Sequence, residues 1–290
     1  MTSSSTRVIS NRVSVRQRLR DIWRYRELLV GLVRKELKVK YKNSVLGFFW
    51  SMLNPALYLC VFYVVFQLVL KAGIPNFAIF LLSGLLVWNL FSTGLPGATG
   101  SIVGNAAIVK KVAFPREILA MAAVGASLVH FVLQAAVMVL ALVAFQYPPS
   151  PGYLLLVPLA LLALLLFTCA LGVLLSAVNV YLRDTQHLLE LTLLAWFWST
   201  PIVYQYRLVA DRLHENAWIY RLNPVTPIVL TFQRAIYAKT DPAGAHILPR
   251  GVGPEWYAGQ LLGVIAFSLV LFLVALHVFG RLEGNFAEEL

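Results

Sequence analysis

Five aromatic side chains inside long apolar runs have the most suggestive chemistry in this sequence. Trp196 and Trp198 lie deep within one run, too far from its ends for the aromatic belt at a membrane surface. Stacked rings with scattered amides suit a pathway for sugars, whose C–H faces pack on aromatics and whose hydroxyls need hydrogen-bond partners. Ordinary helix packing is an equally good interpretation of any single ring. The candidate channel residues are Tyr58, Phe62, Trp88, Trp196 and Trp198.

No catalytic or metal-binding motif is recognisable. The sequence lacks Gly-x-Ser-x-Gly, His-Glu-x-x-His, a Cys/His metal spacing and the lysine motif of an ATPase. Ionisable groups within the apolar runs are limited to His130, His277 and Glu190. A charge at the bilayer centre costs at least about 2.5–3.5 kcal/mol, and ion-coupled carriers usually display such residues. We therefore expect no metal, cofactor or catalysis in this chain, and an energy source outside it.

Two short charged segments between the apolar runs could contact a soluble partner. The first combines three cations with an aromatic residue and a proline, which suits docking into a groove on another protein. Its plainer interpretation is a charge cluster that stops translocation. The second is an adjacent basic and acidic pair, whose members do not share a helix side and so reach different neighbours, or else simply mark topology. The residues are Lys110, Lys111, Phe114, Pro115, Arg116, Arg183 and Asp184.

The composition indicates an integral membrane protein. Of the 290 residues, 59% are hydrophobic and 13% charged, with a mean hydropathy of +0.75, whereas soluble domains carry about 25% charged residues. The first 45 residues carry +9 of the net charge of +11. This excess predicts a cytoplasmic segment next to lipid and not a nucleic-acid-binding protein. Cys60 and Cys169 lie in apolar runs and are expected to be free thiols.

Six apolar runs predict transmembrane helices, since crossing a core of about 30 Å takes roughly 20 residues. We expect the second run to break at Pro96-Gly97 and the fifth to be kinked at Thr200-Pro201. The segment 222–236 contains only about 12 consecutive apolar residues, so it is either re-entrant or an extracytoplasmic amphipathic helix. Lys and Arg near the span ends place the N-terminus in the cytoplasm, and the C-terminus joins it there if the segment 222–236 is not counted as a span, which the resemblance described below implies. The six runs are 50–70, 77–95, 118–146, 153–180, 188–204 and 256–280.

Residues 20–38 are predicted to form one amphipathic helix. At 100° per residue, apolar side chains gather on one face and most charged side chains on the other. Such a helix lies in the membrane interface, its basic face toward anionic headgroups or an acidic partner, whereas a simple topology signal needs no amphipathicity. The chain thus divides into a cytoplasmic region, 1–45, and a transmembrane domain, 46–290. The main interface residues are Ile22, Trp23, Tyr25, Arg34, Lys35 and Lys38.

Taken in order, these segments resemble the transmembrane subunits of bacterial ABC-2-type polysaccharide exporters, which move lipid-linked O-antigens, teichoic acids and related glycans. The similarity spans nearly the whole chain. The matching motifs are Tyr41-x-x-Ser44-x-Leu46-Gly47-x-x-Trp50 followed by Asn54-Pro55, Phe114-Pro115-Arg116-Glu117, Arg183-Asp184, Thr200-Pro201-Ile202-Val203-Tyr204, and Leu222-Asn223-Pro224 through Arg234.

The resemblance implies an all-α membrane protein that exports a lipid-linked polysaccharide. It implies a homodimer of six-span subunits in the bacterial inner membrane, joined to two copies of an ATP-binding subunit that would bind ATP and Mg. Residues 105–117 would include a coupling helix seated on that ATPase, and 181–187 a second contact. The N-terminal helix would be an interfacial gate helix, and 222–236 would be re-entrant on the outer side.

Two other functions remain open at this point. An ABC-2 exporter of a drug or lipid would share the fold. A membrane-embedded glycan ligase or acyltransferase would need charged groups at the membrane face. The candidates for that chemistry are Arg207, Asp211, Arg212 and His214.

Overall fold

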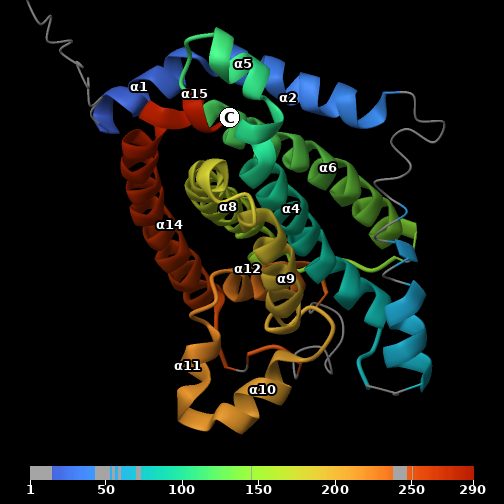
Figure 1. Ribbon diagram of the computed structural model, residues 1–290. Helices are drawn as coiled ribbons and strands as arrows, with labels where there is room; N and C mark the ends of the chain where they lie inside the picture. Colours follow the sequence, from blue (N-terminus) through green and yellow to red (C-terminus); the bar gives the residue numbers. More distant parts are fainter. Residues whose placement is uncertain are drawn as a thin grey trace, which may run out of the picture.

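Four long apolar helices form the centre of the computed structural model (Figure 1). The structure describes residues 15–42, 53, 56–57, 60–69, 73–144, 146–237, 247–249 and 251–290, and this part of the chain contains helices and no strand. The all-α prediction is therefore confirmed for the described residues. The central helices are α4 (Phe77–Gly104), α6 (Glu117–Ala144), α8 (Val157–Tyr181) and α14 (Pro254–Leu282).

The helix α4 lies in the middle of this bundle. It packs against α6 on one side and α8 on the other, and α14 packs on α8. Small residues allow the close approaches: a Cβ on Gly172 of α8 would stand 2.7 Å from the Cβ of Ala98 on α4. The predicted break at Pro96-Gly97 is wrong, because α4 continues through Pro96 to Gly104. Neighbouring helices support the proline-containing turn, as is common in membrane-spanning helices.

Two helices cover one end of the bundle where a single helix was predicted. The helices α1 (Val15–Arg24) and α2 (Arg26–Tyr41) are separated at Tyr25, so one continuous helix over 20–38 is wrong. The helix α2 lies against α6, where a Cβ on Gly125 would stand 2.8 Å from Val33. Figure 1 shows both helices crossing the ends of the central helices, beside α5 (Ala106–Lys111) and α15 (Phe286–Glu289).

The helix α9 (Thr185–Trp198) is shorter than the span predicted there. Its 14 residues end before Thr200-Pro201, and residues 199–205 lead without helix into α10 (Tyr206–Leu213). The single turns η2 (His214–Asn216) and α11 (Ala217–Tyr220) follow. In Figure 1, α10 and α11 lie at the end of the molecule opposite to α1 and α2.

The helix α12 (Val225–Ile236) is enclosed by other helices. All of its residues except Arg234 are buried, and it packs on α4 and α8. Gln233 on α12 donates a hydrogen bond of 2.8 Å to the carbonyl of Pro201. A surface amphipathic helix would leave one face exposed, whereas both faces of α12 are covered here.

Short elements complete the described chain. They are η1 (Tyr63–Val69), which is a π-helical turn, α7 (Pro151–Leu154) and η3 (Glu283–Asn285). Of the predicted first span, residues 50–52, 54–55, 58–59 and 70 lie outside the described residues, and Tyr58 is among them.

Candidate functional site

An aromatic groove lies between α4 and α9. It has a volume of about 530 Å³. We call it the α4–α9 groove. Phe62, which stands just before η1, also lines it. The lining residues are Phe62, Trp88, Ser92, Pro96, Glu190, Leu193, Leu194, Phe197 and Trp198.

Four rings in this groove contact one another. Phe197 occupies the middle of the set: its ring centroid lies 5.9 Å from that of Phe62, 5.4 Å from that of Trp88 and 5.5 Å from that of Trp198. The Phe62 and Trp198 rings meet edge to face at 6.4 Å. Three of the five predicted channel residues thus converge on one surface. Trp88 and Phe197 are buried in this set, so the flat apolar face on which the C–H face of a sugar could pack is mainly that of Trp198.

Phe197 was missed as a site residue. Leu189, Leu193 and Phe197 are all buried, at a spacing of four residues that places them on one side of α9. This periodicity was available in the sequence and would have placed Phe197 on the inward face between two tryptophans.

Trp196 belongs to the packing between helices and does not line the groove. Its ring lies edge to face against Phe91 at 5.0 Å and Phe167 at 5.9 Å. Its indole N–H donates a 2.7 Å hydrogen bond to Oδ1 of Asn223, which joins α9 to the start of α12. Trp196 therefore serves to hold neighbouring helices together, whereas the half-exposed ring of Trp198 has a surface available to a ligand.

Polar groups stand beside the rings. The Ser92 hydroxyl and the Glu190 carboxylate both belong to lining residues of the groove. Pro96 has no N–H, so the carbonyl of Ser92 lacks its usual helix donor. Glu190 is exposed, with His187 Nδ1 4.0 Å from its carboxylate. The groove thus combines stacking faces with acceptors for hydroxyl groups.

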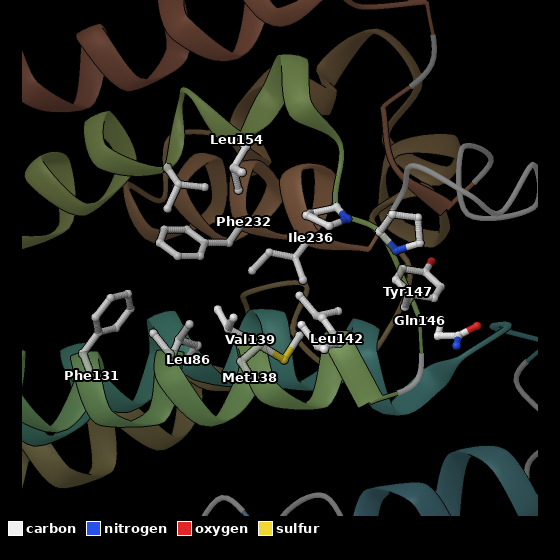
Figure 2. Close-up of a pocket in the computed structure, with 15 residues that line it drawn as sticks. Leu86, Phe131, Met138, Val139, Leu142, Gln146, Tyr147, Leu154, Phe232 and Ile236 are labelled. Carbon is white, nitrogen blue, oxygen red and sulfur yellow. The ribbon is translucent and has the colours of Figure 1, made fainter.

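A second cavity of about 600 Å³ lies between α6 and α12 (Figure 2). Phe131, Met138 and Leu142 of α6 face Phe232 and Ile236 of α12 across it. Its lining is almost wholly apolar, so it offers little to the hydroxyls of a sugar. Of the two cavities, the α4–α9 groove is the one whose chemistry fits a glycan.

The residues with metal-binding or acid–base side chains are scattered over the described part of the chain. No group of three or more His, Cys, Asp or Glu residues there could hold a metal ion. Of the residues considered for a ligase, Arg207 and Asp211 form an exposed ion pair of 2.7 Å one turn apart on α10. In this pairing each of the two charges has the other as its partner.

The residues predicted to contact a partner fall into two groups. Lys110 and Lys111 on α5 are exposed, as is Asp184 at the start of α9. Arg116 instead donates a 2.8 Å hydrogen bond to the carbonyl of Glu283, and Arg183 donates one of 3.5 Å to the carbonyl of Glu289.

The rest of the first segment has a mixed position. Phe114 and Pro115 are half-buried, and Phe114 packs against the apolar cluster at this end of the molecule. Phe114, the aromatic residue predicted to dock on a partner, is thus partly buried within this chain. The charged side chains that α5 exposes are those of Lys110 and Lys111.

A buried ion triad beside these loops was not predicted. Arg18 of α1 is 8% exposed and forms ion pairs with Glu117, which is fully buried, and with Glu283, at 2.6 Å from the latter. Glu117 begins α6 directly after the Phe-Pro-Arg motif, so a carboxylate at that place was visible in the sequence. Its partner Arg18 lies 99 positions away, and Glu283, the second partner of Arg18, lies 265 positions from Arg18, which no local pattern reveals.

Some of the residues predicted to form the interface helix contact the helix bundle, and the others are exposed. Ile22 packs with the bundle, and Lys35 donates a hydrogen bond to Oδ1 of Asn105 at the end of α4. Trp23 is 74% exposed, and the guanidinium of Arg26 lies 6.0 Å from its ring. The remaining residues of the set, Tyr25, Arg34 and Lys38, are exposed.

Together, the four long apolar helices are those expected of a multi-pass membrane protein. The model of the ABC-2 type transporter family matches residues 27–237. The chain therefore belongs to the ABC-2 type transporter family.

Its relatives are permeases of glycan export systems. The chain is similar to the O-antigen export system permease protein RfbA of Myxococcus xanthus, with 34% identity over 272 residues that cover 94% of this chain and 98% of the relative. A protein of the same name from Klebsiella pneumoniae is 29% identical over 91% of this chain and 95% of its own length. The polysialic acid transport protein KpsM of Escherichia coli is 22% identical over 71% of this chain and 80% of its own length.

Proposed function

We propose that this chain is the permease subunit of an ABC transporter that exports a lipid-linked polysaccharide across the bacterial cytoplasmic membrane. The α4–α9 groove is the observation that carries the proposal, because it joins four aromatic rings to hydroxyl acceptors along a helix of the membrane domain. The names of the relatives agree with this chemistry.

The groove would hold successive sugars through many weak contacts. The half-exposed ring of Trp198 would take C–H faces over the buried rings of Trp88 and Phe197, while the Ser92 carbonyl and the Glu190 carboxylate would accept hydrogen bonds from hydroxyls. An aromatic contact is worth about 0.5–1.5 kcal/mol beyond its buried area. Contacts of this size can be broken and remade one at a time, which a moving polymer requires.

The membrane arrangement follows from the distribution of charge. The four long helices would be joined by a span around 50–70 and by α9 together with the non-helical residues 199–204 that follow it, giving six crossings, with α12 re-entrant from the outer side. The basic helices α1 and α2 lie at the end that also carries α5 and α15 (Figure 1). By the positive-inside rule, this end and both termini would face the cytoplasm.

The energy would come from a partner. Two copies of the chain would assemble with two ATP-binding subunits, which hold ATP and Mg. Exposed Lys110, Lys111 and Asp184 would contact those subunits, since charged groups at a rim guide association.

The test uses the complex of this chain with its ATPase, reconstituted in liposomes, and two tryptophan variants. Trp198 and Trp218 are 50% and 51% exposed, but Trp218 lies on α11, outside the groove. Trp198→Ala should raise the lipid-linked glycan concentration needed for half-maximal ATPase stimulation about 5- to 10-fold, equivalent to about 1–1.4 kcal/mol. Trp218→Ala should leave it unchanged.

Equal effects of the two variants would contradict the role of the groove. Stimulation by the bare lipid carrier as strong as that by the glycan would indicate a lipid exporter. Glycosyl transfer by the purified chain without any ATPase would overturn the transport function.

A further inference from the structure

We propose that the C-terminal segment, residues 282–290, is a mechanical relay that joins the two predicted ATPase-contacting loops to each other and to α1. The inference rests on the proposed function, because it assumes an ATPase that moves those loops. The segment comprises Leu282, which is the last residue of α14, followed by η3, α15 and Leu290.

Both loops bind this segment. In the first, Arg116 donates its 2.8 Å bond to the carbonyl of Glu283, and its guanidinium lies 5.8 Å from the ring of Phe286. In the second, the Tyr181 hydroxyl donates a 2.6 Å hydrogen bond to the carbonyl of Leu282. Arg183 reaches the carbonyl of Glu289 at the far end of the segment.

The segment is anchored to the bundle by one buried ring. Phe286 is fully buried, with its ring 5.4 Å from that of Phe279 on α14 and 6.1 Å from that of Tyr181. Four residues of helix alone would not keep α15 in place, because isolated short helices are marginal in water. Its position is therefore set by this ring and by the bonds from the two loops.

The buried ion triad extends the connection to α1. Arg18 contacts the carboxylates of Glu117, where the first loop enters α6, and of Glu283, where the C-terminal segment begins. Arg18 and Glu117 are costly to separate, because each buried charge would be left in a low dielectric without its partner, and the partly exposed Glu283 adds a second contact to the same guanidinium. The first loop, the C-terminal segment and α1 are thus held as one unit (Figure 1).

These contacts predict how a movement would spread. A displacement of the first loop by the ATPase would pull on Glu117 and on Glu283, and so on α1 and the end of α14 together. Through Tyr181 and Arg183 the same displacement reaches the start of α9. If the segment were merely a cover on the bundle, removing its polar contacts would lower stability but leave the glycan exported per ATP unchanged.

The experiment measures ATP hydrolysis and glycan export in the reconstituted complex, for Tyr181→Phe and Glu283→Gln. Tyr181→Phe keeps the ring against Phe286 and removes one hydroxyl. Tyr153→Phe is the matched control, because the Tyr153 hydroxyl also donates to a backbone carbonyl, that of Val252, at the end of α14 remote from this segment. We expect ATP hydrolysis within 2-fold of wild type and a 3- to 10-fold lower export per ATP in the two relay variants, with the control unchanged.

The possible outcomes test the relay and the proposed export function separately. An unchanged export per ATP, or a parallel fall in hydrolysis and export, overturns the relay. A wild-type complex that shows neither glycan export nor glycan-stimulated hydrolysis overturns the proposed function instead. Thermal unfolding of each variant identifies one that does not fold, and Tyr181→Phe, the gentler change, then decides the question.

Discussion

Exchanging each of two neighbouring tryptophans for phenylalanine should separate the packing of α9 from its groove surface. Trp196→Phe removes the indole N–H that donates to Oδ1 of Asn223 at 2.7 Å. The same Oδ1 still accepts a bond from the amide of Val225, so the loss is that of one hydrogen bond, about 1 kcal/mol. The smaller ring also leaves a gap between Phe91 and Phe167, which lowers the unfolding free energy by about 1–2 kcal/mol more.

The expected total for Trp196→Phe is therefore about 2–3 kcal/mol of unfolding free energy. Trp198→Phe alters a ring that is half exposed and should cost within about 0.5 kcal/mol. Titration of the purified chain with a denaturing detergent, followed by helix content, gives both differences under the same conditions. The second measurement is the stimulation of ATP hydrolysis by glycan in the reconstituted complex. Trp198→Phe should weaken this stimulation. Trp196→Phe should not weaken it at temperatures where the variant stays folded.

The reasoning fails if Trp198→Phe is the more destabilising exchange. It fails equally if Trp196→Phe weakens glycan stimulation while its stability matches wild type, since Trp196 would then face the substrate.

Two further predictions concern helix packing and pH. Gly172→Ala should destabilise the bundle by about 1–3 kcal/mol despite its better helix propensity, because its Cβ would meet that of Ala98 at 2.7 Å, and adding Ala98→Gly should restore stability. Burial raises the pKa of Tyr220, and its hydrogen bond with Tyr204 adds to the shift. The unfolded tyrosine loses its proton near pH 10 while the folded one retains it, so the unfolding free energy should fall above about pH 10, and less steeply in Tyr220→Phe.

Controls for both are present in the chain. Nothing lies within 4 Å of a Cβ placed on Gly263 of α14, so Gly263→Ala should be neutral or stabilising in the same detergent titration. A gain of stability from Gly172→Ala alone would contradict the close helix contact. For the pH prediction, identical slopes for wild type and Tyr220→Phe between about pH 9 and 11 would contradict the shifted titration.

Length and hydropathy were sufficient to locate most of the membrane-spanning helices. The predicted runs 118–146 and 256–280 correspond to α6, Glu117–Ala144, and α14, Pro254–Leu282. A bilayer imposes this regularity, because every backbone amide within it must be bonded inside the helix. The same rule explains the error at Pro96: a proline that would end a soluble helix is tolerated where neighbouring helices hold the turn.

The candidate groove could be predicted only in part. Trp196 and Trp198 are two positions apart, which is 200° around a helix, so the sequence shows that they face different sides. It does not show which side carries the groove, since that depends on how α9 rests on α4. The ion triad of Arg18, Glu117 and Glu283 was still less accessible, because three charges from distant positions meet only after the helices have packed.

The positions of the groove and of the C-terminal segment make α9 the wall that can move. The opposite wall, α4, is buried among α6, α8 and α12, whereas Leu188, Leu191 and Leu194 on α9 are exposed. Only one side of α9 is packed, so shifting it breaks fewer apolar contacts than shifting α4. The helix starts directly after the loop that holds Arg183, and it carries Trp198 at its other end, about 20 Å away at 1.5 Å per residue. If the ATPase displaces this loop as proposed, the spacing of the rings in the groove would change without requiring the central helices to separate.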